Sequence, residues 1–171
     1  MSRISKIEYE YADENVKKVM DQHVAQGYRI TNMKKTLLHS ITAFQSLEDG
    51  FYRLQEQLEK FLEARTMTIF GYAISSNDDC LVCSAYFNKL LKDQGIDYAT
   101  FSFTEKEAVL IQFAQELVNH KGHVSDEVLD QLQEQFDEQQ IVEITSFAAL
   151  LVANNFFNNA LQVNSELLMD K

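Results

Sequence analysis

The sequence contains no proline and no tryptophan, and only five of its 171 residues are glycine. Proline removes a backbone hydrogen-bond donor and glycine destabilises helix interiors, so their scarcity favours long uninterrupted helices. A chain of this length suits one domain, which can bury roughly 70% of the surface that it exposes when unfolded. The composition therefore predicts one globular domain that is rich in helix.

Positive charge is also scarce: 15 Lys and Arg residues stand against 26 Asp and Glu residues, a net charge of -11. Nucleic-acid backbones and anionic membrane surfaces both attract a basic surface, so we expect neither as a partner. The N-terminus lacks the apolar run of a signal peptide, and the longest fully apolar run, 147–153, is far shorter than the ~20 residues that span a bilayer. We expect a cytoplasmic protein without a membrane partner.

Apolar residues recur at intervals of three and four along most of the chain, which is the spacing of an amphipathic helix. In the first hundred residues this spacing predicts helices over 12–26, 33–44, 51–62, 67–75 and 80–94. Residues 98–103 are the one segment that suits a strand, and they have no evident partner strand. The expected fold class is all-α.

Capping residues mark the helices of the C-terminal half. Thr104 with Glu107 forms a capping box, in which the hydroxyl accepts a backbone N–H and the carboxylate reaches back to the first residue. Ser125 precedes another helix, and Asp137 opens a long helix that is apolar over more than one stripe. The apolar stripe of this helix suits the core of the domain, and the additional apolar positions leave an interface between copies of the chain as the alternative.

The two cysteines of the chain form a C-x-x-C pair, Cys80 and Cys83, at the predicted start of a helix. Residues three apart share a helix face, so the two sulfurs can meet. The positive end of the helix dipole stabilises a thiolate, which is the reactive form of cysteine. Asp78 and Asp79 oppose ionisation of the neighbouring Cys80, so this argument prefers Cys83 as the nucleophile and Cys80 as the resolving thiol.

Three other interpretations of the pair remain open from the residues alone. The cysteines could be two small packing residues at a helix end. They could bind zinc, but structural zinc takes four ligands, so His120 and His123 would have to complete the site. A thioredoxin-type site is disfavoured because no strand–helix–strand pattern surrounds the pair.

Three segments, SSNDDCLVCSAYFNKLLKDQGID, FTEKEAVLIQFAQELV and HVSDEVLDQLQEQFDEQQIVEITSFAALLVANNFFNNAL, resemble the carboxymuconolactone decarboxylase and alkylhydroperoxidase (AhpD-like) family in their order and spacing. The resemblance covers about residues 33–163. It implies an all-α helical bundle of the AhpD-like type that spans 1–171 as a single domain, with 1–30 as an N-terminal helical extension. It also implies a homo-oligomer.

Members of this family that carry C-x-x-C resemble peroxidases that reduce hydroperoxides and are then reduced by a thiol or dithiol partner. The decarboxylase members lack the pair, so its presence favours the redox branch. By resemblance, Cys83 is the peroxidatic thiol and Cys80 the resolving thiol. The implied partners are a hydroperoxide substrate and a thiol or dithiol reductant, and the redox-active disulfide replaces any cofactor or metal.

The chain departs from the family at both proton-handling positions. The family places a glutamate twelve residues before the first cysteine, where this chain has Thr68, and a histidine four residues after the second, where it has Phe87. General acid–base groups contribute ~10²–10⁴-fold to a rate. Glu63, Asp79 or Tyr86 could substitute for them. We therefore expect a slow or degenerate peroxidase, with a non-catalytic helical oligomeric binding or scaffold protein as the alternative.

Overall fold

The computed structural model describes residues 2–165, which contain helices and no strand. The elements are η1 (Tyr9–Tyr11), α1 (Glu14–Ala25), α2 (Asn32–Leu37), α3 (Ile41–Leu58), α4 (Ala64–Asn77), α5 (Leu81–Asp93), α6 (Glu105–Asn119), α7 (Asp126–Gln135) and α8 (Glu138–Leu161). The expected all-α class is confirmed.

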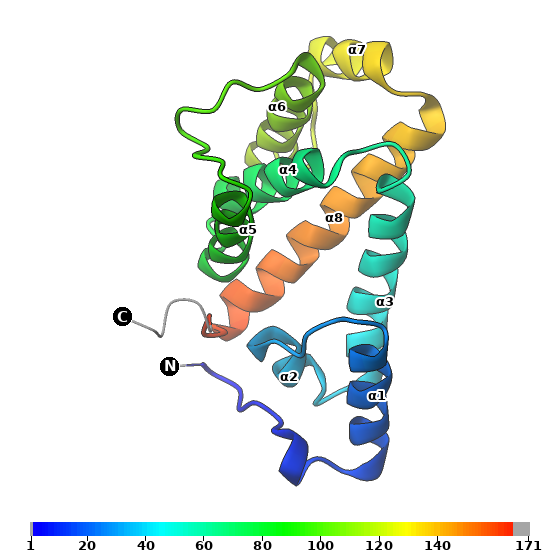
Figure 1. Cartoon of the computed structure of the whole chain (residues 1–171), viewed down its shortest axis with the longest axis vertical. Helices are drawn as coiled ribbons and strands as arrows, with labels where there is room; N and C mark the ends of the chain where they lie inside the picture. The colour runs from blue at the N-terminus through cyan, green and yellow to red at the C-terminus, as the bar shows by residue number, and fades with distance from the viewer. Residues whose placement is uncertain (1, 166–171) are drawn as a thin grey trace.

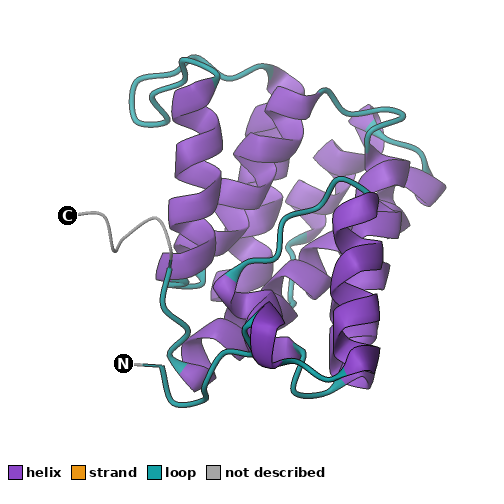
Figure 2. Ribbon diagram, turned by 60° about the horizontal axis from the view of Figure 1, so that its bottom comes forward, coloured by secondary structure: helices purple, strands orange, loops and turns teal. Residues whose placement is uncertain are grey.

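The long helix α8 runs through the middle of the molecule (Figure 1). It packs against α3 on one side and α4 on the other, while α5 and α6 both pack on α4. The helix α7 lies at the end where α8 begins, and α1 and α2 lie beside the first half of α3 (Figures 1 and 2). This arrangement brings the start of α5 beside the last third of α8.

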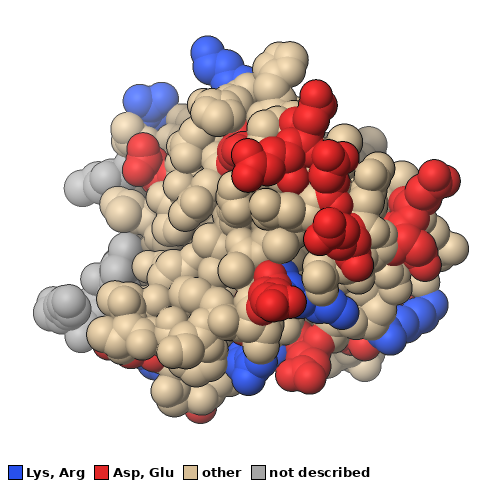
Figure 3. Space-filling view, turned by 90° about the horizontal axis from the view of Figure 1, so that it is seen from above, with Lys and Arg blue, Asp and Glu red and all other residues tan. Residues whose placement is uncertain are grey.

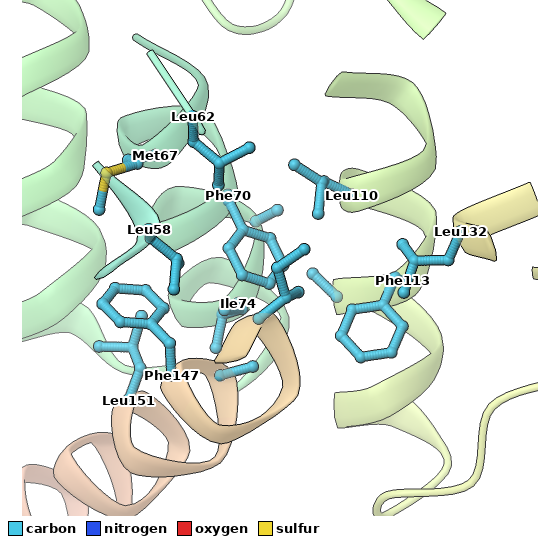
Figure 4. Close-up of a cluster of buried hydrophobic side chains, with 14 of the residues drawn as sticks. Leu58, Leu62, Met67, Phe70, Ile74, Leu110, Phe113, Leu132, Phe147 and Leu151 are labelled. Carbon is cyan, nitrogen blue, oxygen red and sulfur yellow. The ribbon is translucent and has the colours of Figure 1, made fainter. Parts of the chain in front are cut away.

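A core of apolar side chains fills the space between α4, α6 and α8. Figure 4 shows Phe70 and Ile74 of α4 directed toward Phe147 of α8 and Phe113 of α6. Phe70 and Ile74 are fully buried, and burying such a side chain contributes about 1.5–3 kcal/mol. The core therefore fixes α4, and α4 in turn positions the hairpin that leads into α5.

The capping residues expected in the C-terminal half are confirmed. The Thr104 hydroxyl accepts the Glu107 N–H and the Glu107 carboxylate accepts the Thr104 N–H, which completes the capping box at α6. The same carboxylate accepts a hydrogen bond from Arg65 Nε at 2.8 Å, so the cap also ties α6 to α4. Ser125 and Asp137 accept backbone N–H groups at the starts of α7 and α8.

Two boundaries predicted from periodicity are wrong. A helix over 33–44 and another over 51–62 were expected, but the chain leaves α2 at Leu37 and continues as one helix from Ile41 to Leu58. The break occurs because the Ser40 hydroxyl accepts the Ala43 N–H at 3.2 Å and so caps a new helix. Apolar spacing continued through the break because both helices bury their apolar faces in the same core.

The predicted strand over 98–103 is also wrong. These residues form a turn and a loop between α5 and α6. The rings of Tyr98, Phe101 and Phe103 cluster together and pack against the buried Ile69 and Leu91. Aromatic packing on the bundle thus accounts for the strand-like composition.

A second, smaller core joins α1, α2 and the first half of α3, and it contains a buried lysine. The Lys34 ammonium lies 3.3 Å from the Glu48 carboxylate, 2.8 Å from His23 Nε2 and 2.6 Å from the Tyr52 hydroxyl. His23 is buried here as well. Burial, and then the Lys34 charge, lower the pKa of His23 to about 4, so the ring is neutral and accepts from Lys34.

Within residues 2–165, α8 is long and apolar enough to cross a membrane by length and composition alone. The seven-residue apolar run found in the sequence understated this property, because single polar residues interrupt the helix without making it polar overall. In the fold, α8 buries Ile144, Phe147 and Leu151 against its neighbours. These buried side chains account for part of its apolar composition, while Val142 and Phe156 of the same helix stay exposed.

On the molecular face seen from above, acidic side chains gather in the upper right of the view, whereas acidic and basic side chains lie next to one another along its lower edge (Figure 3). The helix α7, which lies on this side, begins with Asp126 and Glu127 in its first turn. Acidic residues in a first turn stabilise a helix through its dipole, so part of the acidic excess has a structural cause.

Candidate thiol site

The cysteine pair lies at the turn between α4 and α5. The Cys80 N–H donates to the Ser75 carbonyl at 3.1 Å, and Asp79 adopts a positive φ of 49° to close the turn. Cys80 is the N-cap of α5: its sulfur accepts the Cys83 N–H at 3.3 Å. The expected helix start near Cys80 is confirmed, and a sulfur atom takes the capping role that an oxygen usually has.

Both thiols are buried and both touch one amide. Cys80 is 0% exposed and Cys83 is 9% exposed. The Asn158 side chain, from α8, lies with Nδ2 3.2 Å from the Cys83 sulfur and 4.0 Å from the Cys80 sulfur. The same nitrogen lies 3.3 Å from the Met33 sulfur, so α2, α5 and α8 meet at this point.

The electrostatics of the pair are the reverse of those expected from the sequence. The hydrogen bond from the Cys83 thiol, with help from backbone N–H groups and Asn158, lowers the pKa of Cys80 to about 7 against the effect of burial. The hydrogen bond to Cys80 and burial raise the pKa of Cys83, and the Asp78 carboxylate acts in the same direction. Near neutral pH the pair thus carries its charge on Cys80, with Cys83 as the donor.

The titration of this pair is open to direct measurement. We expect thiolate absorbance of the reduced protein to rise with a midpoint near pH 7, because the first proton leaves Cys80 there. Asn158→Ala removes a donor to both sulfurs, so the midpoint should rise by several tenths of a unit. An unchanged midpoint in this variant would mean that the amide does not stabilise the thiolate.

The two positions that depart from the family pattern hold no proton relay. The Thr68 hydroxyl donates to the Ala64 carbonyl at 2.8 Å and accepts from Gln94 Nε2 at 3.1 Å. Gln94 is the C-cap of α5, so Thr68 is engaged at the end of that helix remote from the cysteines. Phe87 is buried, and its ring occupies the space beside Gly71, where a Cβ atom would lie within 3.0 Å of three ring atoms.

No protein-family model matches the chain, and no curated protein matches it by sequence. Solved structures do match. The debrominase Bmp8, as a cysteine-to-alanine variant with 2,3,4-tribromopyrrole, has a TM-score of 0.78 at 16% identity and aligns over 97% of this chain and 92% of its own. The alkylhydroperoxidase AhpD core of an uncharacterised peroxidase-related protein from Ralstonia eutropha has a TM-score of 0.70 at 18% identity, over 96% and 92%.

A further uncharacterised peroxidase-related protein, from Silicibacter, has a TM-score of 0.76 at 13% identity, over 96% of this chain and 94% of that chain. The chain has the AhpD-like fold. The resemblance inferred from the sequence therefore extends to the arrangement of the helices along nearly the whole chain. At these identities the AhpD-like likeness concerns the fold, and the chemistry has to be argued from this chain's own residues.

Within the AhpD-like fold, Asn158 is the site residue that sequence reasoning missed. Asn154, Asn155 and Asn158 are all buried on α8, and Asn158 is 1% exposed. Buried amides interrupt an apolar helix at a cost unless they find partners. Three asparagines at i, i+1 and i+4 in a helix expected to be core were the signal that could have found this site.

The residues considered as substitutes do not reach the sulfurs of the AhpD-like bundle. Glu63 is the N-cap of α4, Asp79 closes the turn, and the Tyr86 ring packs against Phe87. In residues 2–165 the groups that donate hydrogen bonds to the sulfurs are the Cys83 N–H and the Asn158 amide, and Cys80 also accepts from the Cys83 thiol and the Val82 N–H. Hydrogen bonding, rather than a neighbouring base, therefore stabilises the thiolate.

The zinc interpretation that used His120 and His123 is wrong. Across the described part of the chain, no three His, Cys, Asp or Glu side chains gather in a way that could hold a metal ion. His120 is the C-cap of α6, and the turn after it passes through Lys121 and Gly122, both with positive φ. A histidine at a helix C-terminus suits the dipole there, so His120 has a local explanation.

Proposed function

We propose that this protein is a thiol–disulfide redox protein that reduces hydroperoxides through Cys80 and Cys83. The observation that carries the proposal is the geometry of the reduced pair, in which the Cys80 sulfur accepts the Cys83 N–H at the start of α5 and the Asn158 amide nitrogen lies beside both sulfurs. The AhpD-like fold and the peroxidase-related names of solved structures that share it support the same chemistry.

The proposed reaction uses Cys80 as the base that the missing glutamate and histidine would supply. Cys80 thiolate takes the proton of Cys83, which is the less buried residue of the pair. The Cys83 thiolate attacks a peroxide oxygen, the O–O bond breaks, and the alkoxide leaves as an alcohol with the proton that Cys80 gives up. The Cys80 thiolate then attacks the sulfenic sulfur of Cys83, which closes the disulfide and releases hydroxide, and solvent protonates the hydroxide to water.

The balance is one hydroperoxide and two thiols converted to one alcohol, one water and one disulfide. An external thiol or dithiol then reduces the disulfide by exchange. Turnover should be slow, because the proton of Cys83 has to move to a sulfur that is the weaker base. General acid–base groups contribute ~10²–10⁴-fold to a reaction rate. We expect turnover to be slower by that factor than in a protein that retains the glutamate and the histidine.

The test is hydroperoxide consumption by the purified protein with a dithiol reductant in excess. We expect slow turnover and, without the reductant, one disulfide formed per hydroperoxide consumed. A brominated pyrrole should be assayed alongside, because closing the dithiol delivers two electrons to either acceptor and a solved structure of the same fold holds such a compound. A reduced pair that stays reduced in both assays would overturn the proposal.

One observation favours a non-catalytic alternative, a helical oligomeric binding or scaffold protein in which the cysteines only pack. Cys80 is completely buried, as a packing residue would be. The two functions differ in the rate at which thiol reagents reach Cys83. Rapid modification of Cys83 in the native protein supports redox work, whereas modification only after unfolding supports the scaffold.

Restoring the relay tests why turnover is slow. Phe87 lies one helical turn after Cys83, so a histidine there leans toward the cysteine sulfur. We expect Phe87→His to raise the turnover rate by about 10²-fold, the low end for general acid–base help. Phe87→Leu is the matched control and should give no gain. Equal rates in the two variants would mean that proton transfer is not the limiting step.

We further propose that the protein is a cytoplasmic homo-oligomer. Val142 and Phe156 of α8 are 63% and 60% exposed, so this apolar helix keeps large side chains on the surface. A second copy of the chain would remove them from water, which stabilises an assembly by about 25 cal/mol per Å² buried. Sedimentation of the wild type and of Phe156→Ser would reveal such an assembly.

A further inference from the structure

Three sulfur atoms converge on one nitrogen in this structure. Asn158 Nδ2 lies 3.2 Å from the Cys83 sulfur, 3.3 Å from the Met33 sulfur and 4.0 Å from the Cys80 sulfur. The ligands come from α2 and from the start of α5, and α8 supplies the amide that they surround. The hydroperoxide chemistry uses two of these sulfurs and leaves the Met33 thioether without a role.

We propose that reduced Cys80 and Cys83, together with the Met33 thioether, form a binding site for a soft monovalent cation, Cu(I). The inference uses the same reduced thiols as the proposed function but does not depend on peroxide turnover. Binding forms three Cu–S bonds and displaces the thiol protons, and no electron changes hands. Formation of the Cys80–Cys83 disulfide would abolish it.

The ligand set selects this ion over zinc. Thiolate and thioether sulfurs are soft ligands, and the combination of cysteine and methionine is typical of Cu(I). Structural zinc takes four ligands from Cys, His, Asp and Glu, and the described part of the chain gathers no third such residue beside the pair. Two thiolates and one Cu(I) leave a single negative charge in the site, which nearby N–H donors can stabilise.

The amide at the centre of the sulfurs has few polar contacts of its own. Asn158 is 1% exposed, yet its Oδ1 has no hydrogen-bond partner within residues 2–165. Contacts with sulfur are therefore what hold the amide in place. When an ion enters, the amide can turn aside and still donate to a thiolate, as an outer partner that orients metal ligands does.

The site reaches the surface at one edge. Cys83 is 9% exposed and Met33 is 8% exposed, whereas Cys80 is fully buried. An incoming Cu(I) complex can therefore exchange its ligands one at a time, first for Met33 or Cys83 and then for Cys80.

The test is an anaerobic titration of the reduced full-length protein with Cu(I) in competition with a chromophoric Cu(I) chelator. We expect one Cu(I) per chain, with three sulfur neighbours by X-ray absorption. Met33→Leu should weaken binding at least about tenfold and lower the sulfur count to two. Met67→Leu is the matched control, because Met67 is also 8% exposed but lies in the main core, and its affinity should equal that of the wild type.

Two results would overturn the proposal: reduced wild type that loses Cu(I) to the chelator, or Met33→Leu and Met67→Leu variants that bind equally well. Circular dichroism of each variant shows that a loss of binding is not a loss of fold. Peroxide turnover is measured on the same wild-type preparation without copper. If the protein binds Cu(I) but hydroperoxide never forms the disulfide, the copper site stands and the redox function is refuted. If hydroperoxide forms the disulfide but the reduced protein does not bind Cu(I), the redox function stands and the copper site is refuted.

Discussion

Replacement of Cys83 by serine is expected to reduce hydroperoxide turnover to background, a loss of at least about 10²-fold. Cys83 is the less buried of the two cysteines. Without it, the protein has no accessible thiol that can attack the oxidant and then form a disulfide with a second thiol. Cys80 cannot take over, because its sulfur is fully enclosed and caps α5. The measurement is hydroperoxide consumption with a dithiol reductant, followed by mass spectrometry of the protein.

The matched variant is Cys80→Ser, which keeps the proposed attacking thiol and removes the proposed base and resolving thiol. After one addition of hydroperoxide, this variant should hold one sulfenic acid on Cys83 that a sulfenic-acid trap captures, and it should form no disulfide. Cys83→Ser should yield no trapped product on Cys80. If the trapped sulfenic acid appears on Cys80 and not on Cys83, the two roles are exchanged.

Replacement of Glu48 by leucine is expected to lower the free energy of unfolding by about 3 kcal/mol. Both members of the Lys34–Glu48 pair are almost fully buried, with side chains 7% and 4% exposed. Removing the carboxylate leaves a buried ammonium without that countercharge, which costs much more than the pair itself contributes. Chemical denaturation followed by circular dichroism measures the loss.

The control is the double variant Lys34→Met with Glu48→Leu. Apolar residues of similar volume in place of both charges should restore most of the stability, because replacing a whole buried pair is close to neutral. Lys34 also lies 2.8 Å from His23 and 2.6 Å from Tyr52, so the double variant should not recover completely. A double variant less stable than Glu48→Leu alone would show that these polar contacts, and not the charge, dominate.

Helix boundaries that depend on a few neighbouring residues could be predicted from the sequence. Errors arose where tertiary packing determined the secondary structure. The capping box of Thr104 and Glu107 and the cap at Ser125 depend on a few neighbouring residues, so they were read correctly. The Ser40 cap was missed because apolar spacing continued on both sides of it. The 98–103 loop was mistaken for a strand because its aromatic rings pack on α4 and on the two flanking helices α5 and α6, rather than on a partner strand.

The position of the site could be predicted from the sequence, but its electrostatics could not. The C-x-x-C spacing located the sulfurs at a helix start, but the direction of their titration depends on which sulfur accepts the Cys83 N–H, and periodicity does not contain that fact. Asp78, expected to act on Cys80, instead acts on Cys83. Asn158 lies 75 residues further along the chain from Cys83, so only the folded structure brings the two together.

The use of a cysteine sulfur as the cap of α5 links the stability of a helix to a reduction potential. Cys80 accepts the Cys83 N–H best as a thiolate, and a disulfide sulfur is a much poorer acceptor. An N-cap contributes about 1 kcal/mol, so oxidation removes roughly that much from the first turn of α5. For a two-electron couple this corresponds to about 20 mV toward easier reduction of the disulfide. The stability of the capped helix thereby favours the dithiol form of the pair over the disulfide.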